Sequence, residues 1–250
     1  MTANYHTHTW RCHHAQGTER EYVEAAIESG MTLLGFSDHA PYPYPSAYEA
    51  TYKMLPSQLE DYVTTILDLK KEYRDDIEIR LGFEAEYYPA MWDGFLRLIE
   101  PYPIDYLLLG QHFLENEYDD PEYCANYTGS ADRLRRYCSQ CREALETGKF
   151  FYFAHPDLIS FTGDDDLYEK EMTKLCRFCR EREIPLELNL LGISFQKPYP
   201  REQFWRIAAE EGNTVIFGSD AHRPEGVFPS DAVQEAERLL ESCGFSGQRI

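Results

Sequence analysis

Short apolar stretches alternate with amphipathic stretches along the whole sequence, and this alternation limits the fold more than any other feature. Seven stretches rich in apolar or β-branched residues predict strands, at residues 4–9, 32–37, 77–87, 104–113, 149–155, 184–190 and 213–219. Helical periodicity follows each of them, at residues 19–29, 57–74, 91–99, 130–147, 166–182, 201–211 and 229–242. Ser57-Gln58-Leu59-Glu60 predicts a capping box at the start of the second helix, and the acidic run at residues 164–166 predicts a loop that leads into the N-terminus of the fifth. Such an alternation predicts a parallel sheet with right-handed crossovers.

The absence of a linker-like stretch among these repeats predicts one domain spanning residues 1–250. We expect an α/β fold of the (β/α)7 TIM-like barrel type, with a doubly wound open sheet as the alternative. No Gly-x-Gly-x-x-Gly or Walker-type loop follows a predicted strand, which disfavours nucleotide binding. Residues 41–56, rich in Pro and Tyr, predict a long irregular loop after the second strand.

The charge of the chain restricts its partners. It carries 24 Lys and Arg against 44 Asp and Glu, a formal net charge of −20. This excess repels phosphate backbones, so we expect no nucleic-acid partner. No apolar run approaches the roughly 18 residues of a membrane span, and the first residues lack a signal-peptide pattern. A cytoplasmic protein with no membrane partner is therefore expected.

The seven cysteines include two Cys-x-x-Cys pairs, Cys138/Cys141 and Cys176/Cys179. An odd number of cysteines cannot all pair, and a chain of this length needs no disulfides. The gap between the pairs exceeds that of a zinc ribbon, and each pair lies on one face of a predicted helix. Packing in helices is the favoured interpretation, with a structural metal or a redox role as the alternative.

The histidines gather where predicted strands end. His6 and His8 end the first strand, and His13 and His14 lie in the loop after it. His112 and His155 end the fourth and fifth strands, and His39 and His222 follow the second and seventh. The carboxyl ends of parallel strands meet at one mouth of a barrel, where active sites are built. Acidic side chains occupy equivalent positions, at Glu84, Glu86 and Asp220.

Imidazoles and carboxylates in this arrangement indicate a metal centre. His6 and His8 are two residues apart, which places both rings on the same face of a strand. This mixture of ligands suits Zn, Fe or Mn rather than Ca. One tetrahedral ion could not use so many ligands, so we expect two or three divalent ions, with Glu84 or Asp220 as a bridging carboxylate.

These motifs, in this order, resemble the PHP (polymerase and histidinol phosphatase) superfamily. The matching set is His6-Thr7-His8, His14, Ser37-Asp38-His39, Glu84, His112, His155 and Asp220-Ala221-His222. The segments 82–86, 110–112, 155–159 and 218–222 are most similar to histidinol-phosphatase-type members. The resemblance spans the whole chain and implies a distorted (β/α)7 barrel, with a trinuclear metal centre at the C-terminal ends of the strands.

The resemblance also implies how the ligands are shared among three divalent ions. The first ion would be held by His6, His8, Glu84 and Asp220, the second by Glu84, His112 and His155, and the third by His14, His39 and His222. His14 is preferred to His13 because it lies six residues after His8, as in the family pattern.

The implied activity is hydrolysis of a small phosphomonoester by attack of a metal-bridging hydroxide on phosphorus, with L-histidinol phosphate as the leading substrate. Catalytic roles fall to Asp220, Glu84 and His222, with Asp220 as a proton carrier to the leaving group. Asp38 and Asp157 adjoin ligands and either orient imidazoles or cap strand ends.

Substrate contacts depart from the histidinol-phosphatase pattern at two places. Ser160-Phe161 and Ser194 stand where that pattern has phosphate-clamping basic residues. Lys197, Arg201 and Arg223 are then the cationic groups nearest the predicted mouth, and we expect them to bind substrate. Tyr42, Tyr44, Tyr87 and Tyr88 either pack the core, the favoured interpretation, or line the pocket.

Two other functions remain as alternatives. One is a PHP-type hydrolase that acts on another phosphomonoester, a phosphodiester or an amide. The other is a non-catalytic metal-binding module, which the full set of ligands disfavours. A panel of substrates and the substitution of His39 or Asp220 would separate the three possibilities.

Overall fold

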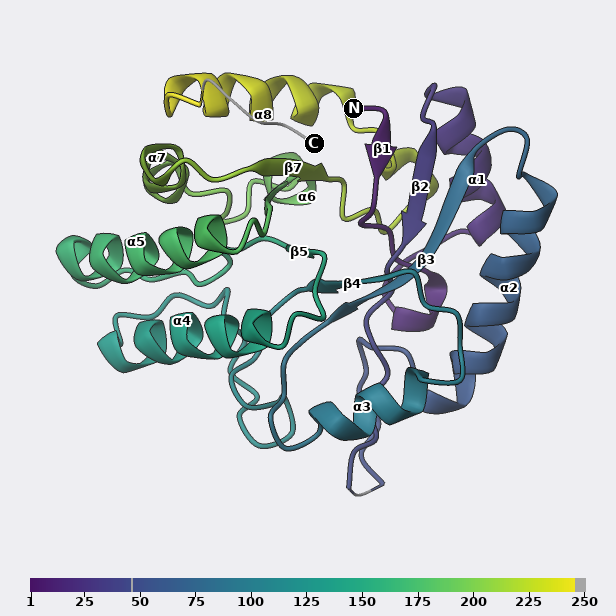
Figure 1. Cartoon of the computed structure of the whole chain (residues 1–250), viewed down its shortest axis with the longest axis horizontal. Coiled ribbons are helices and arrows are strands. Elements are labelled where there is room, and N and C mark those ends of the chain that lie inside the picture. Colours follow the sequence, from purple (N-terminus) through teal and green to yellow (C-terminus); the bar gives the residue numbers. More distant parts are fainter. Residues whose placement is uncertain (46, 246–250) are drawn as a thin grey trace. The chain divides into compact units, whose positions relative to one another are not determined.

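Strands and helices alternate through the chain as the sequence predicts (Figure 1). The computed structural model describes residues 1–45 and 47–245. Its strands are β1 (Ala3–Asn4), β2 (Leu33–Phe36), β3 (Glu78–Ala85), β4 (Tyr106–Leu109), β5 (Tyr152–Phe153), β6 (Leu186–Asn189) and β7 (Val215–Gly218). Its α-helices are α1 (Glu19–Glu28), α2 (Leu59–Glu72), α3 (Trp92–Ile99), α4 (Ala131–Glu146), α5 (Asp165–Glu181), α6 (Leu190–Ser194), α7 (Glu202–Glu211) and α8 (Ser230–Ser242). Short 3-10 helices are η1 (Trp10–Cys12), η2 (Pro56–Gln58) and η3 (Pro224–Gly226).

The sheet follows the order of the sequence, from β1 to β7, and the pairs β1/β2, β2/β3 and β5/β6 are parallel. Two compact units divide the chain, unit 1 formed by Met1–Leu108 and Gly218–Pro229, and unit 2 by Leu109–Phe217 and Ser230–Ile250. The boundaries fall inside β4 and β7, so each unit contains part of these strands. The expectation of one domain over residues 1–250 stays a prediction.

Unit 1 packs α1 and α2 against β2 and β3. Tyr22 of α1 contacts Phe36 of β2, with ring centroids 6.3 Å apart, and Tyr62 of α2 lies 5.2 Å from Phe83 of β3. Thr18 begins α1, where its hydroxyl accepts the N–H of Glu21 while the Glu21 carboxylate accepts the N–H of Thr18. This reciprocal cap satisfies two backbone donors at the start of the helix.

Tyr106 holds the backbone just before His6 in place. Tyr106 lies over Gly82, where an added Cβ would come within 2.6 Å of the tyrosine ring. Its hydroxyl donates to the carbonyl of Tyr5 at 2.7 Å. Glycine on β3 therefore lets Tyr106 reach across the sheet and hold the residue just before His6.

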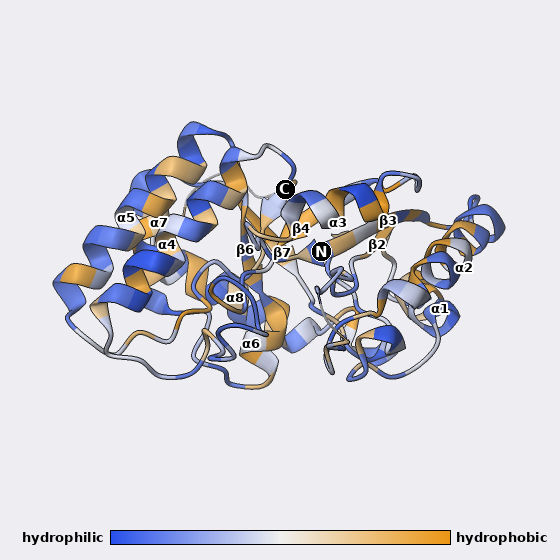
Figure 2. Cartoon of the chain, turned by 90° about the horizontal axis from the view of Figure 1, so that it is seen from below, coloured by the Kyte–Doolittle hydropathy of each residue, from blue (hydrophilic) through white to orange (hydrophobic). Residues whose placement is uncertain are grey.

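Unit 2 contains a layer of amphipathic helices. The hydrophobic and hydrophilic faces of α4, α5 and α7 alternate in Figure 2. Asp164 is the N-cap of α5 and accepts the N–H of Leu167 at 2.8 Å, so the acidic run at residues 164–166 begins a helix as expected. Cys138, Cys141, Cys176 and Cys179 are all buried, which confirms the prediction that they pack in helices.

Three local predictions differ from the structure. The first strand ends at Asn4 instead of residue 9, and Thr7 forms only an isolated bridge with Ala221. Ser57 does not cap α2 because residues 56–58 form η2, and the Gln58 side chain accepts the N–H of Leu55 at 2.9 Å. The short helix α6 has five residues, too few for a helical period to be visible in the sequence.

Candidate metal centre

The chain between β1 and His8 lies beside the segment that follows β7. Asn4 connects the two, since its Nδ2 donates to Thr7 Oγ1 at 2.8 Å and to Ser219 Oγ at 2.7 Å, while its Oδ1 accepts the N–H of Ser219 at 3.0 Å. His8 N–H then donates to the carbonyl of Ala221 at 2.9 Å. A buried asparagine thus replaces strand pairing at this point and brings the two segments together.

Potential ligands of unit 1 converge in two groups. The ligand atoms of His6, His8 and Glu84 all lie within 4.8 Å of one another, and so do those of His14, His39 and His222. Asp220 adjoins the first group, with Oδ1 3.0 Å from His8 Nε2 and 3.6 Å from His6 Nε2. The two groups meet where His39 Nδ1 lies 3.0 Å from Glu84 Oε2. These are the sets of residues that the sequence assigns to the first and third ions.

Backbone carbonyls set the tautomers of two of these histidines. His14 Nδ1 lies 2.8 Å from the carbonyl of Cys12, and His222 Nδ1 lies 2.9 Å from the carbonyl of Asp220. A carbonyl oxygen can only accept, so Nδ1 carries the hydrogen and Nε2 of the neutral ring carries a lone pair. The two Nε2 atoms are 2.9 Å apart. Because two lone pairs at this distance repel each other, the arrangement favours a cation that both nitrogens bind.

Burial and charge separate the pKa values in this cluster. Burial opposes the charged form of His8, but contacts with Asp220, Asp38 and Glu84 raise its pKa to about 9. Burial, together with the charge of His8, lowers the pKa of His222 to about 3. Burial also opposes ionisation of Asp220, yet the neighbouring histidines hold its pKa well below the ordinary value. The cluster therefore combines the ionised carboxylate of Asp220 with neutral and protonated imidazoles.

Asp38 contacts both the backbone of His39 and the ring of His8. It accepts the N–H of His39 at 2.9 Å on Oδ1 and the hydroxyl hydrogen of Thr9 on Oδ2. The same Oδ1 lies 3.4 Å from Nδ1 of His8. The capping role of Asp38 is therefore confirmed, and its orienting role stays a prediction that the 3.4 Å distance to His8 supports. Asp157, by contrast, accepts the N–H of Arg201 at 2.6 Å, which ties it to the start of α7, and burial raises its pKa to about 6.

A buried arginine that the sequence analysis overlooked holds the loop between His8 and His14. Arg11 is 2% exposed; its Nε donates to Asp61 at 3.0 Å, and Nη1 donates to Glu19. The loop is therefore anchored to α1 and α2 through charge-assisted hydrogen bonds. Only the pattern of an arginine between histidine motifs could have suggested this role.

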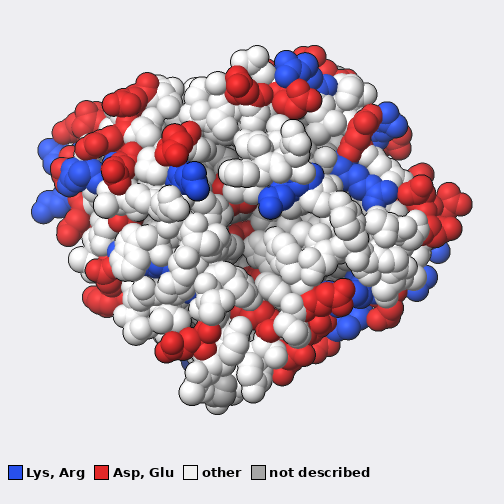
Figure 3. Space-filling view, turned by 180° about the vertical axis from the view of Figure 1, so that it is seen from behind, with Lys and Arg blue, Asp and Glu red and all other residues white. Residues whose placement is uncertain are grey.

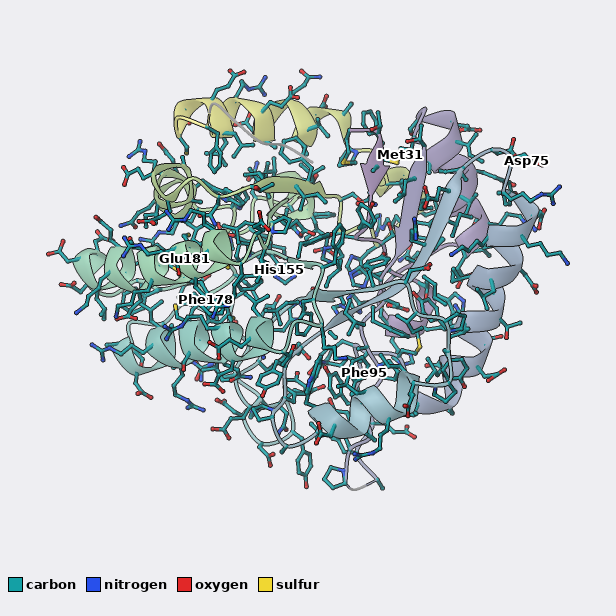
Figure 4. All side chains as sticks on the ribbon, viewed as in Figure 1. Met31, Asp75, Phe95, His155, Phe178 and Glu181 are labelled. Atoms are coloured by element: carbon teal, nitrogen blue, oxygen red, sulfur yellow. The ribbon has the colours of Figure 1, made fainter. Side chains whose placement is uncertain are left out.

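The remaining two histidines of the predicted ligand set lie in unit 2. The ring centroids of His112 and His155 are 4.9 Å apart. Tyr123 stacks on His112 at 5.9 Å, and Tyr199 lies 5.9 Å from His155. His155, labelled in Figure 4, lies two residues after the end of β5 and has a positive φ of 31°, which is uncommon outside glycine. The sequence predicted both histidines as ligands of the second ion.

The three predicted substrate-binding side chains differ in their contacts and exposure. Arg201 donates to the carbonyl of Phe161 at 2.8 Å and to Asp165 at 3.1 Å, and it stacks over Tyr168 at 3.8 Å. Lys197 and Arg223 are both exposed. Figure 3 shows Lys and Arg side chains dispersed among Asp and Glu on the visible face, not gathered into one basic patch. The roles of the three cations stay predictions.

Glu86 lies apart from the ligand groups in its contacts. Its carboxylate pairs with Lys53 and accepts the hydroxyl hydrogen of Tyr88. Tyr42 and Tyr88 are buried, with ring centroids 4.8 Å apart, and Tyr42 stacks on Phe95 at 5.1 Å. Packing is thus the role of these two tyrosines, as favoured from the sequence. Nothing in the sequence indicated that Lys53 pairs with Glu86.

The residues present fit divalent cations. Both ring nitrogens of His8 are buried, and among the described residues neither has a partner in hydrogen-bond geometry, although Asp220 lies close. A buried imidazole in such a position is costly unless a cation completes its contacts. Imidazole and carboxylate donors together match the preferences of Zn, Mn or Fe.

Comparison with known proteins agrees with this geometry. The PHP domain model matches residues 4–190. The chain belongs to the PHP domain family. Over 92% of this chain and 90% of the relative's length it is 32% identical to a probable histidinol-phosphatase of Deinococcus radiodurans. It is 37% identical to the histidinol-phosphatase of Bacillus subtilis, with coverage of 95% and 98%.

A solved structure extends the likeness to the fold. Histidinol phosphate phosphatase of Lactococcus lactis, in complex with Zn, L-histidinol and phosphate, matches with a TM-score of 0.73 at 19% identity, covering 99% of this chain and 95% of that protein. Together with the strand order, this confirms the predicted (β/α)7 barrel class. In the described part of the chain, every helix is too short or too polar to span a membrane.

Proposed function

We propose that this PHP-family protein is a metal-dependent phosphomonoesterase whose leading substrate is L-histidinol phosphate. The observation that carries the proposal is the convergence of His6, His8 and Glu84, with Asp220 beside them, on one buried point of unit 1. The relatives named as histidinol-phosphatases and the Lactococcus lactis complex with Zn, L-histidinol and phosphate support the same reaction. Histidine biosynthesis is the expected context.

Divalent cations are the proposed cofactors, three in number, with Zn, Mn and Fe as candidates. His6, His8, Glu84 and Asp220 would hold one, His14, His39 and His222 another, and His112 and His155 would serve a further ion. When bound, such ions polarise the phosphoryl group, lower the pKa of water and neutralise negative charge. Ligation requires a neutral imidazole, so the proton that His8 holds must leave as a cation enters.

The residues of the chain supply position and proton transfer. Glu84 and His39 are held together by a backbone bridge, which fixes their side chains with little entropy left to lose. Asp220 has a positive φ of 50°, so its carboxylate is held at a sharp turn after β7. We assign Asp220 as the carrier of a proton to the leaving alkoxide, and His222, which donates its Nδ1–H to the carbonyl of Asp220, as a ligand of a cation that would neutralise charge on the phosphoryl group.

The substrate itself is the least constrained part of the proposal. Arg223 and Lys197 have side chains exposed enough to meet a phosphate, whereas the guanidinium of Arg201 already contacts Phe161 and Asp165. We therefore rank Arg223 and Lys197 above Arg201 as phosphate contacts. Another small phosphomonoester is the second candidate substrate, because Ser160-Phe161 and Ser194 replace basic residues of the family pattern.

Phosphate release tests the proposal. Purified protein, stripped with a chelator and reloaded with Zn²⁺ or Mn²⁺, should release phosphate from L-histidinol phosphate and lose this activity again on chelation. A panel of other phosphomonoesters and of phosphodiesters identifies the preferred class. Activity that survives complete metal removal would overturn the metal-dependent mechanism, and turnover of phosphodiesters alone would overturn the phosphomonoester assignment.

A further inference from the structure

A buried ion pair lies next to the metal ligands but takes no part in the ligand groups. Lys53 and Glu86 are each 2% exposed, and the ammonium of Lys53 contacts the Glu86 carboxylate. Charged side chains are almost never buried unless they are paired, because burial removes the water that solvates the charge. Stability alone is a weak reason for such a pair, since apolar residues of similar volume often stabilise a core as well.

Tyrosines fix the geometry of this pair. Tyr88 accepts a hydrogen bond from Lys53 Nζ at 3.0 Å and donates its own hydroxyl hydrogen to the Glu86 carboxylate. Tyr42 donates to the backbone carbonyl of Glu86. The ammonium also faces the rings of Tyr88, Tyr42 and Tyr52, at 4.8, 5.3 and 5.6 Å from their centroids. Cation–π contacts and hydrogen bonds together leave Lys53 one position.

The pair lies at the ends of the two segments that carry His39 and Glu84. Glu86 is two residues beyond Glu84, and Lys53 precedes Met54, whose N–H donates to the carbonyl of His39 at 3.4 Å. Ala40 N–H donates to the carbonyl of Glu84 at 2.9 Å. Between Pro41 and Leu55 the described residues form no helix or strand, so local structure does not hold this loop in place.

We infer that Lys53 and Glu86 form a positioning pair that clamps the irregular loop to the end of β3 and thereby holds His39 and Glu84 in ligand geometry. The inference rests on the proposed metal centre, and it assigns neither residue a contact with metal or substrate. It also explains why an irregular loop can follow His39 without loosening it. Partners that orient metal ligands from behind contribute about 10- to 100-fold to metal affinity.

The test measures zinc affinity, which is independent of turnover. Lys53→Met keeps the apolar stem, Glu86→Gln keeps the shape of the carboxylate, and the double variant removes both charges. Dissociation constants come from competition with a chromogenic chelator, and the visible spectrum of the Co²⁺-loaded protein reports ligand geometry. Lys70→Met is the matched control, since Lys70 pairs with Asp105 at 2.8 Å on the surface of the same unit.

We expect both single variants to bind Zn²⁺ about 10- to 100-fold more weakly and to show an altered Co²⁺ spectrum, while the control stays within about twofold. If a single variant does not fold, the double variant decides, because no unpaired buried charge remains in it. We expect it to fold and still bind Zn²⁺ weakly. Native affinity and an unchanged Co²⁺ spectrum in the folded double variant would overturn the inference. Tight zinc binding by the native protein without phosphatase activity would instead refute only the proposed function.

Discussion

Two kinds of motif with metal-binding side chains occur in this chain: the histidine and carboxylate motifs of unit 1 and the two Cys-x-x-Cys pairs. The side chains of the first kind converge, whereas those of the second pack inside helices. The candidate ligands of unit 1 lie near or beyond the carboxyl ends of strands, and the ligand atoms of His6, His8 and Glu84, like those of His14, His39 and His222, come within 4.8 Å of one another. Cys138, Cys141, Cys176 and Cys179 lie in α4 and α5, where their thiols are buried among other helix residues. The secondary structure that carries a motif, more than its spacing, decides whether its side chains meet at a site or fill a core.

Ionisation follows the same division. Burial raises the pKa of Cys138 and of Cys179 to about 12, so both remain thiols near neutral pH. In unit 1, His8 and Asp220 each hold the other in its charged form, with a pKa of about 9 for His8 and a pKa well below the ordinary value for Asp220. Opposite charges within a buried cluster are a feature of functional sites, whereas isolated buried thiols are a feature of cores.

The largest expected effect is the loss of a central ligand. His8→Ala should reduce phosphatase activity by more than the roughly 100-fold that loss of an orienting partner costs, because His8 lies at the meeting point of Asp220 and Glu84. Steady-state phosphate release and bound metal, measured by elemental analysis, check this. A His8→Ala protein with native metal content and activity would contradict the role of the unit 1 histidines as metal ligands.

The next effect concerns the partner of His8. Asp38→Asn keeps the acceptor for the N–H of His39 but removes the charge beside His8 Nδ1. We expect zinc affinity and activity to fall by about 10- to 100-fold with the fold retained. Calorimetric titration with Zn²⁺ measures the affinity, and circular dichroism serves as the control for folding. An unchanged affinity would mean that Asp38 is only a cap.

The pH dependence of the thiols gives a third prediction. With a pKa of about 12, about one thiol in ten thousand is ionised at pH 8, so iodoacetamide should modify Cys138 and Cys179 only after unfolding. Because these pKa values are raised by folding, the thiols favour the folded state below their ordinary pKa and oppose it as pH rises through about 12. Peptide mass spectrometry after labelling decides the matter. Rapid modification of either residue in the folded protein would contradict their place in the core.

The smallest effect is expected in the helix layer. Cys176→Ala removes one buried sulfur and should lower the free energy of unfolding by about 1 kcal/mol, with zinc affinity and activity unchanged. Urea denaturation and chelator competition measure the two quantities separately. A loss of bound metal in this variant would show that the cysteine pairs have a role in metal binding after all.

Most of the element order could be predicted because the strands are apolar and the helices strongly amphipathic. Predictions failed where side chains override local pattern. His6 and His8 do not continue β1, since Asn4 uses its amide to bind Thr7 and Ser219, which is far away in the sequence. Ser57 is not the N-cap of α2 as predicted, because Pro56 begins a 3-10 helix in front of α2.

The candidate ligands of unit 1 could be predicted to lie together because their motifs are close to the carboxyl ends of strands, whereas the residues that support them could not be predicted. Lys53 belongs to no motif, and Glu86 ends the segment 82–86 without any sign in the sequence that it pairs with Lys53, since η2, α2 and β3 lie between them. Arg11 likewise contacts α1 and α2 through carboxylates that resemble ordinary surface residues in the sequence. Contacts between distant charged residues depend on tertiary packing, and a single sequence contains no periodic signal for them.

The central claim is that the strand-end cluster binds the metal that hydrolysis requires. The most direct measurement is phosphate release from L-histidinol phosphate by chelator-treated protein during a stepwise titration with Zn²⁺, alongside His39→Ala and Cys141→Ala. We predict that activity returns in proportion to bound zinc in the native protein and in Cys141→Ala, but not in His39→Ala. Full activity without zinc, or in the His39→Ala protein, would contradict the claim.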